Sequence, residues 1–130
     1  MAYILTQREE DLCSIIVDYA YKVHLTLGPG LLEKIYEACF CHELSKRNIP
    51  FNRQKVLGIS YDNLIFDEGL KLDVLVDDLI ICEFKAVDIV NPIWQAQLLC
   101  HLKLTKLHVG FILNFNVPIM KNGIRRYCKD

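Results

Sequence analysis

The chain has 130 residues, of which 52% are hydrophobic and 24% are charged. This balance excludes a disordered chain, and no apolar run reaches the roughly 18 residues that a membrane-spanning helix needs. Fifteen Lys and Arg side chains against sixteen Asp and Glu give a formal net charge of −1, which excludes a general attraction to nucleic acid or anionic lipid. We therefore expect one soluble, cytoplasmic domain over residues 1–130 that makes no membrane contact.

Two amphipathic helices are predicted first. Over residues 8–27, apolar side chains recur at three- and four-residue steps, which is typical of a helix packed on a core. The Gly-Pro-Gly sequence at residues 28–30 ends this helix. The same periodicity predicts a second helix from residue 31 to about residue 47.

A run of strands is predicted next. Residues 51–60 read as the first strand, and residues 61–69 are rich in turn-forming side chains, with a short strand at 64–66 as one option. Residues 70–76 and 80–86 are predicted as two strands around a tip that contains two aspartates.

The C-terminal part predicts one helix and two further strands. Asn91 is a suitable cap, and Pro92 a suitable first residue, for a helix that runs to about residue 104. The apolar run at residues 107–115 predicts a buried strand, and residues 124–128 an edge strand. The resulting order predicts an α/β fold in which helices pack against a mixed sheet.

Six cysteines lie within apolar segments and form no Cys-x-x-Cys pair. We interpret them as reduced, buried, small hydrophobic side chains. A metal cluster of Cys39, Cys41 and His42 is the alternative, but this spacing within one helix matches no common zinc pattern.

The hairpin in the middle of the chain can close in two registers. A two-residue turn would mix charged and aliphatic side chains on both faces, and an unpaired charge is costly to bury. A three-residue turn, residues 77–79, pairs Val76 with Ile80 and places Asp73 opposite Glu83. One face is then wholly apolar, with Leu72, Val74, Val76, Ile80, Cys82 and Phe84 on it. We predict the three-residue turn.

This register predicts a site. Directly opposed residues stand roughly 5 Å apart at Cβ, so the Asp73 and Glu83 carboxylates repel each other unless a cation lies between them. Mg²⁺ suits such a pair, and Lys85 projects on the same face, where its ammonium can neutralise charge on a phosphoryl group. A surface network of Asp, Glu and Lys salt bridges is the alternative interpretation.

Asp73, Glu83 and Lys85, placed on successive strands after a helix that carries Glu33, resemble the PD-(D/E)xK nuclease superfamily. The sequence Gly30-Leu-Leu-Glu-Lys-Ile-Tyr36 further resembles the motif of the GxxExxY protein family, a small branch of that superfamily. The likeness continues at residues 23–24, 96–99, 102–105, 113–116 and 123–126 and so covers almost the whole chain. It implies a restriction-endonuclease-like α+β sandwich, with a mixed central sheet of four to five strands flanked by helices.

The resemblance also implies roles for individual residues. Asp73 and Glu83 would be metal ligands together with the carbonyl of Phe84, and Lys85 would be the catalytic lysine. Glu33 would bind the ion directly or through water. The implied cofactor is Mg²⁺ or Mn²⁺.

Three more side chains are candidates near this site. Gln97 matches a glutamine that related nucleases use to orient the lysine or a phosphate. The family usually has a tyrosine four residues later, where this chain has His101, which can also donate to a phosphate. Tyr36, one turn beyond Glu33, either bonds that carboxylate or is a core tyrosine.

Arg125 and Arg126, with Lys121 and Lys129, form a basic cluster in the sequence that either follows a phosphate backbone or is a solvated edge. The leading hypothesis is a divalent-metal-dependent nuclease that acts on DNA or RNA. The alternative is a catalytically inactive module with the same fold that binds nucleic acid or a protein. Because the net charge is close to zero, we expect a homodimer or a protein partner to complete the binding groove.

Overall fold

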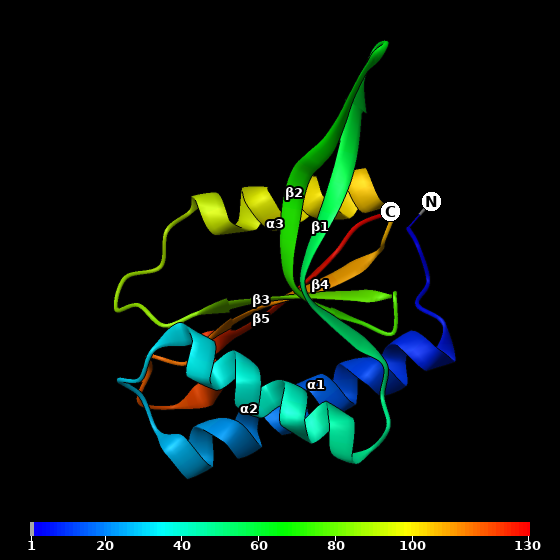
Figure 1. Ribbon diagram of the computed structural model, residues 1–130. Coiled ribbons are helices and arrows are strands. Elements are labelled where there is room, and N and C mark those ends of the chain that lie inside the picture. The colour runs from blue at the N-terminus through cyan, green and yellow to red at the C-terminus, as the bar shows by residue number, and fades with distance from the viewer. Residues whose placement is uncertain (1) are drawn as a thin grey trace.

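A five-stranded sheet runs through the middle of the molecule, with two helices on one face and a third on the other (Figure 1). The computed structural model describes residues 2–130. The elements in chain order are α1 (Gln7–Leu27), α2 (Glu33–Lys46), β1 (Phe51–Tyr61), β2 (Leu64–Val76), β3 (Ile80–Lys85), α3 (Ile93–Thr105), β4 (Val109–Asn114), the short 3₁₀ helix η1 (Met120–Gly123) and β5 (Ile124–Cys128).

The strands lie in the order β1-β2-β3-β4-β5. Strands β3 and β4 are parallel and are connected through α3, whereas the other neighbours are antiparallel. The predicted order of elements and the mixed, helix-flanked sheet are confirmed, and the fold is α+β of the restriction-endonuclease-like kind.

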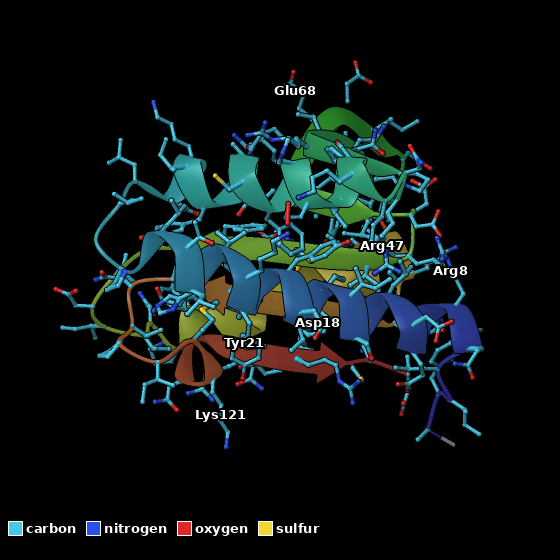
Figure 2. The ribbon with its side chains drawn as sticks, turned by 90° about the horizontal axis from the view of Figure 1, so that it is seen from below. Arg8, Asp18, Tyr21, Arg47, Glu68 and Lys121 are labelled. Carbon is cyan, nitrogen blue, oxygen red and sulfur yellow. The ribbon has the colours of Figure 1, made fainter. Side chains whose placement is uncertain are left out.

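The sheet separates two apolar layers. The larger layer packs α1 and α2 against the sheet, with Phe40, Phe84 and Phe115 at its centre. Figure 2 looks onto this side and shows α1 lying between α2 and β5. The smaller layer packs Leu98 and Leu102 of α3 against the opposite face. Because side chains alternate along a strand, successive residues of β3 enter different layers.

Side-chain caps start two of the helices. Thr6 and Glu9 form a reciprocal capping box at the start of α1, which was not predicted, whereas the predicted cap at Asn91 is confirmed. The Asn91 side chain accepts the backbone N–H of Ile93 at 3.0 Å, which caps the start of α3. Helix α2 begins at Glu33, two residues later than predicted.

The segment predicted to be turn-rich, residues 61–69, is a turn only at Asp62 and Asn63. The optional strand at residues 64–66 is present, but it is longer than predicted, because β2 continues without a break through the rest of the segment. Pairing with β1 satisfies the backbone of this segment, so its polar side chains can stay exposed on a hairpin that projects from the sheet (Figure 1).

The predicted three-residue turn is confirmed, because Val76 pairs with Ile80 and Val74 with Cys82. The predicted face is wrong for Leu72, which packs in the α3 layer beside Ile81. Regular alternation ends at Asp73: the β2–β3 ladder stops at Val74, and the β1 residue beside Asp73, Gln54, has a positive φ of 51°.

All six cysteines are free thiols. Cys13, Cys41 and Cys82 are buried as predicted, whereas Cys100 and Cys128 are exposed, which contradicts the interpretation that all six belong to the core. No helix in residues 2–130 is long and apolar enough to cross a membrane.

Candidate active site

The separation of β2 from β3 creates the site. Beyond Val74 the two strands no longer pair, and the backbone N–H of Phe84 donates to Oδ2 of Asp73 at 2.8 Å. The carboxylate thus takes the place of a neighbouring strand. Backbone groups alternate between the edges of a strand, and the Lys85 carbonyl accepts from Phe115 on the β4 side at 2.9 Å. The Phe84 carbonyl therefore points to the edge where Asp73 lies.

Glu83 lies next to Asp73 and under α3. Its side chain is 13% exposed, and its Oε1 atom has no hydrogen-bond partner in residues 2–130. Burial, followed by the charge of Asp73, raises the pKa of Glu83 to about 7, against an opposing effect of His101. The carboxyl groups of Asp73 and Glu83 are therefore held close together at a cost in free energy, and a bound cation would lower that cost.

Four of the predicted side chains line one small cavity beneath α3. Glu83 and Lys85 enter it from β3, and Gln97 and His101 enter it from successive turns of α3. Its volume of about 20 Å³ is the space of a single water molecule. His101 Nδ1 lies 3.5 Å from Glu83 Oε1, an ion-pair distance that leaves both buried atoms without a hydrogen bond.

The amine of Lys85 is oriented by an aromatic ring. Its Nζ lies 5.3 Å from the ring centre of Trp94, within the range of a cation–π interaction. Sequence analysis did not assign Trp94 to the site. Its spacing of three residues before Gln97 on one helix is the signal that places both on the same face.

Glu33 approaches this site from the first turn of α2. Burial, then the charge of Asp73, raises the pKa of Glu33, whereas the ammonium of Lys85 lowers it. In residues 2–130, however, no three His, Cys, Asp or Glu side chains form a group that could hold a metal ion. The implied direct ligation by Glu33 is therefore not assembled in the structure, and neither is the cluster at residues 39–42.

Tyr36 does not bond Glu33, so the core interpretation is the right one. Its hydroxyl donates to the Gly28 carbonyl at 2.7 Å and accepts the Leu31 N–H at 3.0 Å, and its ring stacks on Phe115. The tyrosine thereby holds the loop that leads into α2.

The basic cluster of the sequence is divided by the sheet. Arg125 lies opposite Ile112 and faces the α3 side, where the cavity residues lie. Arg126 faces the other way and lies beside Cys13 of α1. Of the two predicted nucleic-acid contacts, only Arg125 shares a face with Glu83 and Lys85.

Asn114 is a further residue that sequence analysis did not assign. It pairs with Lys85 in the β3–β4 ladder and is 4% exposed. Its side chain accepts the N–H of Val87 at 3.2 Å and donates to the Val87 carbonyl at 3.0 Å. Asn114 therefore holds the loop that connects β3 with α3.

The residues at this edge fit a hard divalent cation. The carboxylates of Asp73 and Glu83 and the carbonyl of Phe84 supply only oxygen atoms, the ligand type that Mg²⁺ and Mn²⁺ prefer. The unpartnered Oε1 atom of Glu83 is an oxygen that such an ion would satisfy.

An acidic pair where two strands separate, followed by a lysine on the same face, is the arrangement expected in nucleases of the restriction-endonuclease-like fold. A family model described as the PD-(D/E)XK nuclease superfamily matches residues 10–127. The chain belongs to this superfamily, whose nucleases generally use divalent metal ions. Neither the curated proteins nor the solved structures compared with the chain gave a significant match.

Proposed function

We propose that the protein hydrolyses phosphodiester bonds in DNA or RNA with the help of Mg²⁺ or Mn²⁺, and that it belongs to the GxxExxY branch of its superfamily. The observation that carries this proposal is the partly buried pair of Asp73 and Glu83, because an oxygen of Glu83 without a hydrogen bond and the raised pKa of Glu83 mark a place for a cation. The branch is supported by Gly30, Glu33 and Tyr36 at the spacing of its motif.

Each side chain has a distinct role in the proposed reaction. Asp73, Glu83 and the carbonyl of Phe84 hold the ion, which supplies Lewis-acid stabilisation of charge on the scissile phosphate. Lys85, oriented by Trp94, donates hydrogen bonds to a phosphate oxygen or to the attacking water. Gln97 orients the lysine or the phosphate from α3. Water attacks phosphorus and gives up a proton to solvent, the bond to the leaving oxygen breaks, and that oxygen takes up a proton from solvent to leave as a hydroxyl group.

A cleavage assay with matched variants tests this proposal. Labelled single- and double-stranded DNA and RNA are incubated with the protein and Mg²⁺ or Mn²⁺. Asp73→Asn keeps an oxygen that can accept the Phe84 N–H but loses the charge, so we expect normal folding and about a 100-fold or greater loss of cleavage. Lys85→Ala should give a loss of similar size.

The control is Asp78→Asn, because Asp78 is an exposed carboxylate in the turn of the same hairpin. This variant should cleave as the parent does. Cleavage that survives both Asp73→Asn and Lys85→Ala would contradict the proposal. Metal-independent binding without cleavage by the parent protein would favour the inactive binding module instead.

We also propose that a second copy of the chain or a protein partner completes the nucleic-acid groove. The net charge of −1 supports this, because phosphate binding by one copy rests on few cations. Sedimentation of the protein with and without an oligonucleotide tests it, and a complex with a single copy bound would contradict it.

A further inference from the structure

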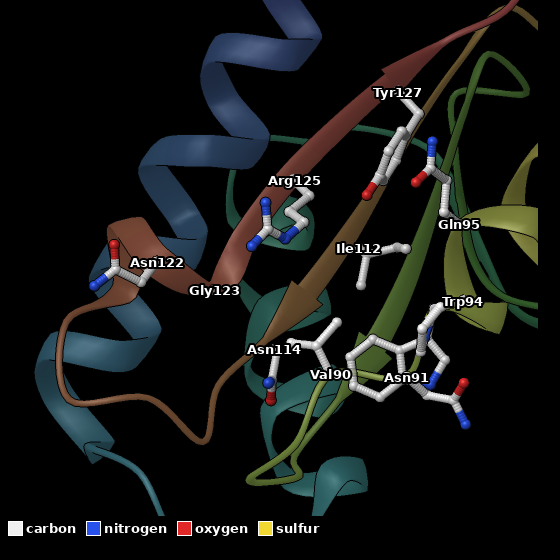
Figure 3. A pocket seen from close by; sticks show the side chains of 11 residues that line it. Val90, Asn91, Trp94, Gln95, Ile112, Asn114, Asn122, Gly123, Arg125 and Tyr127 are labelled. Atoms are coloured by element: carbon white, nitrogen blue, oxygen red, sulfur yellow. The ribbon is translucent and has the colours of Figure 1, made fainter.

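A larger cavity continues from the candidate site along the sheet. It has a volume of about 240 Å³ and lies between the start of α3 and strand β5 (Figure 3). This is smaller than the roughly 300–1,000 Å³ of pockets for drug-sized ligands and suits one ring system with part of a sugar. Trp94 and Ile112 line both this cavity and the small one that contains Lys85.

The register of the sheet sets the distance between Glu83 in the candidate site and Arg125 in the larger cavity. Glu83 pairs with Ile112, and Ile112 pairs with Arg125, so the three residues form a row across β3, β4 and β5. Neighbouring strands are roughly 4.8 Å apart, so the row spans about 10 Å. An adjoining nucleotide can cover that distance from a phosphate held at Glu83.

The lining of the cavity combines aromatic surface with one positive charge. Trp94 contributes an indole from α3, and Tyr127 contributes a phenol ring from β5 (Figure 3). Arg125 enters beside them and forms no ion pair with any residue from 2 to 130. No Asp or Glu lines the cavity, which distinguishes it from the acidic pair at Asp73.

Three further polar side chains of the lining are free to bind, whereas those of Asn91 and Asn114 already form hydrogen bonds. The side chains of Gln95, Asn122 and Tyr127 make no hydrogen bond within the described residues. Amide side chains offer both donors and acceptors, which is what the edge of a nucleobase requires.

We propose that this cavity holds one unpaired nucleotide of the substrate strand, next to the scissile phosphate. The base lies against Trp94 and Tyr127, and Arg125 binds the phosphate of that nucleotide. Because a base in a duplex is stacked and paired, the cavity selects single-stranded or locally unpaired nucleic acid. This inference rests on the proposed function in one respect: the same strand continues to the metal site.

The chain contains a single tryptophan, which makes Trp94 a built-in reporter. In the proposed test, deoxynucleoside 5′-monophosphates, a single-stranded hexanucleotide and a blunt hairpin duplex are titrated into the protein in EDTA, and tryptophan fluorescence is followed. We expect saturable quenching by the monophosphates and the single strand, and at least tenfold weaker quenching by the duplex. Ribonucleotides in a parallel arm report whether the sugar matters.

Matched arginine variants locate the binding. Arg125→Ala removes a charge-assisted contact, so the dissociation constant for the single strand should rise about tenfold or more. Arg126→Ala changes the neighbouring arginine on the opposite face and should have no effect. Tyr127→Leu should weaken binding of the hexanucleotide while leaving the protein folded, as judged by circular dichroism.

The outcomes separate this inference from the proposed function. Quenching without any metal-dependent cleavage would keep the cavity as a nucleotide site and reject the nuclease. Cleavage of duplex and single strand at equal rates, with no quenching, would overturn the cavity proposal and keep the nuclease. Equal weakening by Arg125→Ala and Arg126→Ala would also overturn it, because binding would then be a general charge effect.

Discussion

Among the carboxyl groups of the described residues, that of Glu83 has the most strongly shifted pKa. Its folded pKa of about 7 lies above its ordinary value of 4.5, so the protonated form is favoured in the folded protein. Stability is then highest below the ordinary pKa and falls as pH rises towards the folded pKa. The loss across this window is up to about 3 kcal/mol. Because ionised Glu83 destabilises the folded protein, we infer that this carboxyl group serves a purpose other than stability.

Replacing Glu83 with glutamine tests this directly. Glu83→Gln keeps the shape of the protonated acid and removes the ionisation, so in EDTA the variant should unfold at a higher temperature than the parent at pH 8. At pH 5 the two should be nearly equal. Added Mg²⁺ should stabilise the parent at pH 8 and leave the variant unchanged. Thermal melts between pH 4 and pH 9 provide the measurement.

Glu43 provides a control of opposite sign. Hydrogen bonds with Lys22 and Lys46 lower the pKa of Glu43, so its contribution is present above its ordinary pKa and is lost as pH falls. Glu43→Gln should therefore lower the melting temperature at pH 8. If both variants shifted the melting temperature in the same direction, the explanation from the acidic pair of Asp73 and Glu83 would fail.

Sequence reasoning reached part of the site for a specific physical reason. The register of one hairpin is decided by which side chains can be buried, and this rule placed Asp73 near Glu83. The contacts of Trp94 and Asn114 depend on how α3 and β4 pack on that hairpin. Short-range sequence patterns do not predict such packing between elements.

At the scale of elements, the loop between β3 and α3 controls how Lys85 and Gln97 face each other. Asn114 holds this loop with two hydrogen bonds to Val87, and its side chain also accepts the N–H of Asn116 in its own segment at 3.2 Å. The contact with Val87 is an interaction between elements, because Asn114 ends β4 whereas Val87 follows β3.

Asn114→Ala should lower the free energy of unfolding by about 1–2 kcal/mol, because the buried Asn114 side chain loses its hydrogen bonds to the backbone of Val87, an exposed residue. Cleavage should fall as well, through loss of alignment between β3 and α3. Urea denaturation measures the first effect and the cleavage assay the second. Asn116→Ala, at a half-buried position that contacts Asp88, is the matched control and should cost less. Equal costs for the two variants would contradict the role of Asn114.

Helices and strands differed in how well the sequence predicted them. The ends of α1 and α3 fell within one residue of prediction, because caps and helical periodicity act over a few neighbours. The first half of β2 was predicted only as an optional short strand at residues 64–66, because its pairing with β1 stabilises a segment that has turn composition. The pairing of β2 with β3 ends at Val74, and the break in alternation at Asp73 turns Leu72 to the unexpected face.

At the scale of the whole molecule, charge limits how nucleic acid can bind. The net charge of −1 provides no general attraction, and the sheet separates Arg125 from Arg126. Binding by a single copy must therefore rest on a few local contacts, with Lys85 and Arg125 as the cations on the α3 face of the sheet near the two cavities. We therefore expect the affinity for nucleic acid to depend only weakly on salt concentration.

The number of phosphate contacts is measured by the slope of the logarithm of the association constant for a single strand against the logarithm of the salt concentration. Each phosphate contact with a single strand contributes roughly −0.7, so two contacts predict a slope between about −1 and −2. Arg125→Ala should reduce its magnitude by about 0.7, and Arg126→Ala should leave it unchanged. A slope steeper than about −4 would mean that other cations contact the strand, for example those on the projecting β1–β2 hairpin. The path of the substrate would then lie across that hairpin, and the cavity beside Trp94 would not be its binding place.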